Sequence, residues 1–238
     1  RFGERRGSEL RWAKSTSDQP DQLAATVMQS ISDIRTLLDA YGLSPRHRLG
    51  QNFLHDANQV RRLVDAADLS DGTVVVEVGP GTGVFTRELI KALGDGDQLD
   101  VVELNPAFCE HLRNHVLEAG GSQVELHEGS ITEVTLGGRY DSVVCGLPYN
   151  AFPTHVSRAI LRRLISLIRP GGTLSFFEYA AIRHARRLVG NAQVKREMVW
   201  HERFIQRLET DMSSQRDLVL CNLPPAWAVH LTTSKEPR

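Results

Sequence analysis

Residues Val74 to Thr86 read VVVEVGPGTGVFT, and this stretch decides the fold. Five residues dominated by β-branched valine lead directly into a glycine-rich turn, and a helix-like segment follows from Arg87 to Leu93. A short apolar run that ends in such a turn before a helix is typical of a buried parallel strand. We therefore expect the first strand, turn and helix of an α/β sheet of the nucleotide-binding type.

The spacing of the glycines narrows the choice of ligand. The order is E-x-G-x-G-x-G starting at Glu77, whereas a dinucleotide fold uses G-x-G-x-x-G before its helix. A second apolar run, Leu99 to Val102, ends in Glu103, about 20 residues past the glycines, where an acid can accept both hydroxyls of a ribose. The glycines let a ligand approach the backbone, and the helix N-terminus offers free N–H groups. The glycine turn, followed along the chain by the acidic residue Glu103, predicts a site for an adenosine-containing cofactor.

This order of glycines and acid resembles the S-adenosylmethionine (SAM) site of class I methyltransferases. The resemblance implies a Rossmann-like α/β fold with a seven-stranded, mostly parallel sheet, helices on both faces and an N-terminal helical extension. It also implies cofactor contacts from Glu77, Gly79, Gly81, Gly83 and Glu103.

The region before the first strand is similar to a narrower family. Residues 48–54 read RLGQNFL and are followed by Asp56, which resembles the motif of the ribosomal RNA adenine dimethyltransferases whose loop closes over SAM. The resemblance implies that Asn52 and Leu54 contact the cofactor. The residues alone equally allow a loop held in place by buried Phe53 and Leu54.

Two positions depart from the methyltransferase pattern, and the first is Ser130. A third strand is expected from Val124 to His127, followed by Glu128, Gly129 and Ser130. Class I methyltransferases commonly place an acid after this glycine to bond the adenine amino group. The Ser130 hydroxyl can still form that hydrogen bond, but more weakly than a carboxylate.

The second departure is Gly146, which follows an expected strand from Ser142 to Cys145 and opens the motif G-L-P-Y-N. The adenine methyltransferases have N-L-P-Y-N, in which the Asn accepts from the target amine and the Tyr stacks on its base. On this resemblance Tyr149 and Asn150 are the catalytic residues, and Gly146 lies against the cofactor. The residues alone equally allow Asn150 to close the turn after Pro148. The Tyr149 ring offers stacking or a cation–π contact. A Gly-Leu-Pro start is instead similar to the bacterial phospholipid N-methyltransferases.

The second half of the chain also resembles the phospholipid enzymes, through R-P-G-G at 169–172, expected as a turn before a strand, and N-L-P-P-A at 222–226. The last two strands are expected from Asp217 to Leu223 and from Trp227 to Thr233. Five residues follow the last expected strand, so we expect the appended helical domain of the RNA enzymes to be missing. Residues 143–207 carry eleven basic against three acidic side chains, whereas residues 70–142 carry four against thirteen. Such asymmetry indicates either an anionic partner or a set of solvated helix faces.

Composition sets the remaining expectations. Residues 1–20 read as a flexible tail, 21–69 as an N-terminal helical segment with the loop that closes over SAM, and 70–238 as the SAM-binding catalytic domain. The three cysteines lie far apart and the nine histidines form no metal-binding motif, so we expect no metal and a cytoplasmic compartment. No apolar run reaches about 18 residues, so we expect no membrane span, although attachment at the inner membrane surface is compatible.

These observations together predict a SAM-dependent N-methyltransferase. The main hypothesis for its acceptor is the amine of a phospholipid head group, of the phosphatidylethanolamine type, at an anionic membrane surface. The first alternative is an adenine of ribosomal RNA, with RNA as the partner. The second alternative is a nonenzymatic binding protein on the same scaffold. The sequence does not determine the oligomeric state.

Overall fold

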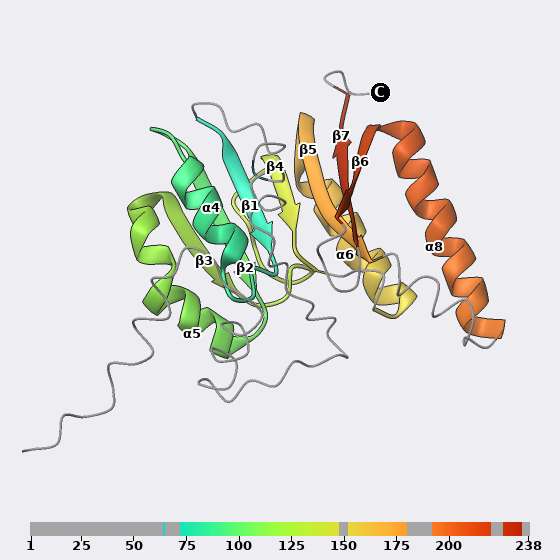
Figure 1. Cartoon of the computed structure of the whole chain (residues 1–238), viewed down its shortest axis with the longest axis horizontal. Coiled ribbons are helices and arrows are strands. Elements are labelled where there is room, and N and C mark those ends of the chain that lie inside the picture. The colour runs from blue at the N-terminus through green and yellow to red at the C-terminus, as the bar shows by residue number, and fades with distance from the viewer. Residues whose placement is uncertain (1–63, 65–71, 148–151, 180–191, 220–225, 235–238) are drawn as a thin grey trace, which may run out of the picture.

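The computed structural model describes residues 64, 72–147, 152–179, 192–219 and 226–234 (Figure 1). Its strands form one seven-stranded sheet in the order β3-β2-β1-β4-β5-β7-β6. They are β1 (Val74–Val78), β2 (Gln98–Glu103), β3 (Val124–Glu128), β4 (Tyr140–Cys145), β5 (Ile168–Tyr179), β6 (Ser213–Val219) and β7 (Ala226–Thr232). The pairs from β3 through β5 are parallel, and β7 runs antiparallel to both β5 and β6. The predicted seven-stranded, mostly parallel sheet is confirmed.

Helices cover both faces of this sheet, as predicted (Figure 1). They are α4 (Val84–Ala92), α5 (Pro106–His115), the 3₁₀ segment η3 (Leu117–Gln123), α6 (Thr154–Leu167) and α8 (Ala192–Asp211). Helices α4 and α5 pack on one face, whereas α6 and α8 pack on the other. No helix in the described part of the chain combines the length and the apolar character needed to cross a membrane.

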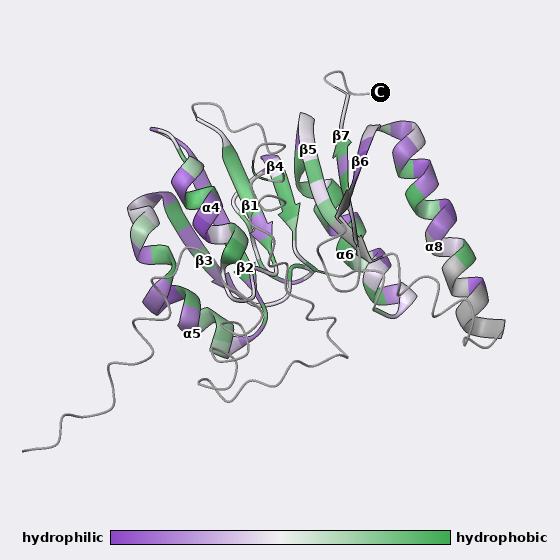
Figure 2. Ribbon diagram, in the orientation of Figure 1, coloured by the Kyte–Doolittle hydropathy of each residue, from purple (hydrophilic) through white to green (hydrophobic). Residues whose placement is uncertain are grey.

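The alternation of side chains along each strand produces two cores. Val75 on β1 and Leu99 on β2 join Leu89 of α4 on one face. Val76 on β1 joins Leu161 of α6 on the other face. Burying one such side chain contributes about 1.5–3 kcal/mol, which explains why the central strands are apolar on both faces (Figure 2).

The first residues of α4 and α5, at the carboxyl edge of the sheet, are determined by the residues that precede them. Helix α4 starts at Val84, three residues before the predicted segment, because Gly83 takes a left-handed φ of 79° and its carbonyl accepts from Arg87 N at 3.0 Å. Helix α5 starts at Pro106 behind Asn105, whose side chain accepts from Ala107 N at 3.1 Å. Both starts lie beside the glycine turn.

Two expected boundaries differ from the structure. The R-P-G-G segment predicted as a turn lies within β5, where the register against β4 shifts between Tyr140 and Ser142 and Gly171 has a φ of 82°. Strand β6 begins at Ser213, earlier than the predicted Asp217, because its pairing with β7 extends to Thr232. The predicted regions 1–20 and 21–69 lie outside the described residues, apart from Val64.

Candidate functional site

The ends of four neighbouring strands are joined by backbone hydrogen bonds at the carboxyl edge of the sheet. The bonds are Gly79 N to Val102 O at 2.9 Å, Gly129 N to Glu103 O at 2.8 Å, and Gly146 N to Val78 O at 2.8 Å. They connect the first residues after β1, β3 and β4 to the last residues of the neighbouring strands β2 and β1. Ligands of open α/β sheets bind at this kind of edge.

The glycine turn after β1 is held in a shape that only glycine adopts easily. Gly79, Gly81 and Gly83 have φ values of 74°, 57° and 79°. A Cβ on Gly79 would lie 2.5 Å from Leu147 Cδ2, and one on Gly83 would lie 2.9 Å from Val116 Cγ2. The turn is therefore clamped between the loop after β4 and the end of α5.

Glu103 is bound directly to this turn. Its side chain is 7% exposed, and its Oε2 accepts from Gly81 N at 3.2 Å while its Oε1 accepts from Asn105 N at 2.8 Å. Burial raises the pKa of Glu103, and these backbone N–H bonds act in the opposite direction. Each carboxylate oxygen can accept more than one hydrogen bond, so capacity remains for a ligand hydroxyl.

Glu77 lies on β1, two residues before Gly79, and is more completely buried than Glu103, at 1% exposure. Burial raises the pKa of Glu77 to about 8, the Thr86 hydroxyl lowers it, and the negative charge of Glu103 raises it further. Among the described residues, none donates to its Oε2. Buried oxygens in proteins are nearly always hydrogen-bonded, so this carboxyl is suited to a donor that a ligand supplies.

His111 supports the turn from behind, and the sequence did not reveal this role. Its imidazole on α5 is fully buried, with Nε2 3.3 Å from the carbonyl oxygen of Thr82. Because a carbonyl only accepts, the contact assigns the proton to Nε2. Burial, followed by the nearby His115, lowers the pKa of His111 to about 4, so the ring is neutral. The two partners are 29 residues apart and share no short motif.

Ser130 lies at the same edge but already has a local partner. The bond from Gly129 N to Glu103 O places its loop beside the end of β2. The Ser130 hydroxyl is 2.8 Å from Thr132 Oγ1 and accepts from Thr132 N at 3.3 Å. A ligand donor at this position would share the hydroxyl with Thr132.

Gly146 is fitted against the glycine turn. A Cβ at this position would lie 2.6 Å from the carbonyl oxygen of Gly79, closer than real Cβ contacts allow. The missing side chain is thus part of how β1 and β4 meet. An asparagine here would require the backbone of one loop to move.

The predicted site residues divide into two groups. The structure brings seven of them to one edge, namely Glu77, Gly79, Gly81, Gly83, Glu103, Ser130 and Gly146. The other four, Asn52, Leu54, Tyr149 and Asn150, lie outside the described residues, so their roles stay predictions. Leu147 joins the site as a contact of Gly79 that the sequence did not single out.

Comparison with known proteins identifies sequence relatives. A family model described as ribosomal RNA adenine dimethylase matches residues 42–211. The ribosomal RNA small subunit methyltransferase A of Leifsonia xyli subsp. xyli is 40% identical over 123 residues, which cover 50% of this chain and 43% of that protein. The probable enzyme of the same name from Methanopyrus kandleri is 33% identical over 140 residues, covering 59% and 47%. The chain spans less than half the length of these relatives.

Solved structures establish the fold. The O-methyltransferase TomG from Streptomyces achromogenes, in complex with SAM, aligns with a TM-score of 0.62 at 18% identity over 90% of this chain and 95% of that chain. The N-methyltransferase NodS from Bradyrhizobium japonicum WM9, in complex with S-adenosyl-L-homocysteine, aligns with a TM-score of 0.59 at 15% identity over 84% and 97%. At these identities the likeness shows the Rossmann-like methyltransferase fold alone.

Proposed function

The chain belongs to the ribosomal RNA adenine dimethylase family, and on that premise we propose that it transfers methyl groups from SAM to the amino group of an adenine in ribosomal RNA. The observation that carries the proposal is the glycine turn bound to Glu103, beside an oxygen of Glu77 to which no described residue donates a hydrogen bond. This arrangement supports SAM as the methyl donor, and the names of the sequence relatives support ribosomal RNA as the acceptor.

The described residues fit SAM by chemistry. Glu103 would accept the ribose hydroxyls while Gly81 N keeps its carboxylate in place. That oxygen of Glu77 suits a cationic donor such as an ammonium group, because a nearby positive charge favours the ionised carboxylate. The positive end of the α4 dipole and the tight glycine turn let the ligand lie against the backbone.

SAM, when bound, supplies an electrophilic methyl group on a sulfonium sulfur. Transfer of that methyl group to an adenine nitrogen would release S-adenosylhomocysteine and one proton from the nitrogen. The protein contributes chiefly alignment, since an in-line displacement gains most from holding the two reactants in place. Tyr149 and Asn150 are the residues proposed to hold the acceptor.

Two observations bear on the acceptor. Helix α6 carries Arg158, Arg162 and Arg163 without an acidic residue, and Arg162 is exposed, which suits the phosphates of RNA. Gly146 still favours the phospholipid hypothesis, because a base amine loses a side-chain acceptor there, at a cost of roughly 1–3 kcal/mol. The family match and the names of the relatives outweigh this single position.

A transfer assay with tritiated SAM tests the proposal. Undermethylated small ribosomal subunits and phosphatidylethanolamine vesicles are offered in parallel, and labelled adenine is identified by nucleoside analysis. We expect label in adenine and none in lipid, with a large loss in Glu103→Ala and little change in the exposed control Glu110→Ala. Label in lipid alone would restore the phospholipid hypothesis. SAM binding without transfer to either acceptor would favour the nonenzymatic alternative.

A further inference from the structure

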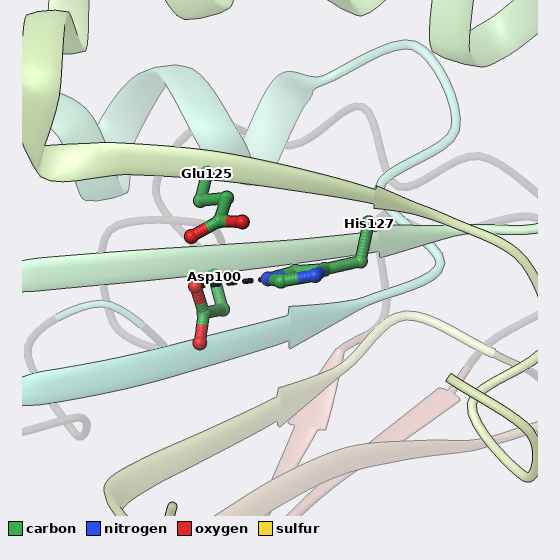
Figure 3. A group of neighbouring side chains, drawn as sticks. All are labelled: Asp100, Glu125 and His127. Atoms are coloured by element: carbon green, nitrogen blue, oxygen red, sulfur yellow. Dashed lines mark hydrogen bonds and ion pairs between the residues drawn. The ribbon is translucent and has the colours of Figure 1, made fainter. Parts of the chain in front are cut away.

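Three side chains with metal-binding chemistry meet on the two strands nearest one edge of the sheet. Asp100 of β2 and Glu125 and His127 of β3 each offer one ligand atom, and these atoms all lie within 4.8 Å of one another (Figure 3). Asp100 is the direct register partner of Glu125, and His127 is two residues further along the same face. Neighbouring parallel strands therefore bring the three groups together.

The carboxylate of Asp100 is fixed by two partners. Its Oδ1 lies 3.0 Å from Nε2 of His127, and its Oδ2 accepts a hydrogen bond from the hydroxyl of Tyr140. Tyr140 is 1% exposed, and burial raises the pKa of its hydroxyl, so that it remains a donor. Metal-binding carboxylates and imidazoles are commonly oriented in this way by an outer hydrogen bond.

The cluster also has an excess of negative charge. Asp100 and Glu125 are like charges directly opposite each other on paired strands, an arrangement that weakens a sheet when nothing neutralises it. The His127 ring contacts Asp100, and within the described parts of the chain no side chain forms a hydrogen bond or ion pair with the carboxylate of Glu125. A divalent cation would neutralise both carboxylates at once.

We propose that Asp100, Glu125 and His127 bind one first-row divalent cation, with Zn²⁺ as the first ion to test. One imidazole with two carboxylates is a ligand set that zinc can use, and bonds of about 2.1 Å place neighbouring ligand atoms roughly 3 to 3.4 Å apart, from octahedral to tetrahedral geometry. The pair of Asp100 and His127 already has that separation, at 3.0 Å. Asp100 and His127 are partly buried and Glu125 is exposed, which leaves room for water as a further ligand.

The ion would have a structural role that is separate from the proposed methyl transfer. Asp100 precedes Glu103 by three residues, and alternation along β2 directs the two side chains to opposite faces of the sheet. The bound cation would link the edge strand β3 to β2 through side chains, in addition to their backbone ladder. Its binding therefore needs neither SAM nor an acceptor.

Equilibrium dialysis of the full chain, first stripped with a chelator, tests the site with Zn²⁺ alone. We expect the wild-type chain to bind one more ion than His127→Gln, and at least tenfold weaker binding at this site in Glu125→Gln. The control is His155→Gln, which removes an exposed histidine of α6 and should bind as the wild type does. Zn²⁺ should also raise the midpoint of thermal unfolding in the wild type and the control, but not in His127→Gln.

Circular dichroism of the metal-free variants tests whether they fold. If His127→Gln does not fold, Glu125→Gln, which changes an exposed position, is compared with the wild type instead. Equal zinc content in the wild type and the cluster variants would overturn the proposal. An equal loss in His155→Gln would likewise show that surface histidines held the ion.

Discussion

Replacing Glu77 with glutamine should remove a specific pH dependence of stability. The pKa of this buried carboxyl is about 8 in the folded chain against 4.5 for the exposed group. Below pH 4.5 both states are protonated, so its burial carries no charge penalty. As the pH rises from 4.5 to 8, the unfolded chain loses the proton while the folded chain retains it, and the free energy of unfolding falls. At about 1.4 kcal/mol per pH unit, the difference approaches roughly 5 kcal/mol above pH 8.

Urea denaturation at pH 5, 7 and 9 measures this effect. Glu77→Gln should lie within about 1 kcal/mol of the wild type at pH 5 and become more stable than it by several kcal/mol at pH 9, because the amide keeps the shape and cannot ionise. Taking the difference between the two chains removes the contributions of other groups, such as His111. The same substitution at the exposed Glu110 controls for the loss of one carboxyl from the chain. A difference between wild type and Glu77→Gln that does not change with pH would refute the reasoning.

Four further predictions concern the proposed site. Glu103→Ala should weaken SAM binding at least tenfold in calorimetry, because it removes hydrogen bonds to a charged group worth about 1.5–3 kcal/mol each before water compensates. Ser130→Asp should keep or tighten SAM affinity in the same assay, since a carboxylate accepts more strongly than a hydroxyl; lost binding in a folded variant would contradict this. Gly146→Ala should cost about 1–3 kcal/mol in urea unfolding, because its Cβ would meet the Gly79 carbonyl at 2.6 Å. Arg162→Glu should reduce methylation of ribosomal subunits and its salt dependence while calorimetry finds unchanged SAM affinity.

The parts of the fold that local signals specify could be predicted from the sequence. The valine run of β1, the glycines behind it and the acid that ends β2 each leave a pattern within a few residues. Pro106 and Asn105 likewise mark the start of α5. Boundaries were less accurate where pairing decides them, as at Ser213 of β6, whose register against β7 is set by the partner strand.

Contacts between distant segments leave no such pattern. The cluster of Asp100, Glu125 and His127 depends on the register of two strands, so a search for short metal-binding motifs predicted no metal there. The same holds for the contact between His111 and Thr82. The lack of a donor to one oxygen of Glu77 among the described residues is also a product of packing, since the motif position alone does not show which groups surround it.

The close approach of Gly146 to Gly79 has different consequences for the binding of SAM and for the binding of the acceptor base. In the adenine enzymes that the motif resembles, an asparagine at this position accepts from the acceptor amine, and here the carbonyl of Gly79 occupies the space of its Cβ. The same glycine turn binds Glu103 through Gly81 N. The chain therefore retains the backbone arrangement expected to hold SAM while lacking one side chain expected to hold a base. An adenine acceptor must then be positioned by other groups, with the Tyr149 ring as the first to test. Tyr149→Ala should consequently abolish methyl transfer to ribosomal subunits and leave SAM affinity intact. If SAM affinity fell together with methyl transfer, Tyr149 would instead be needed to bind the cofactor.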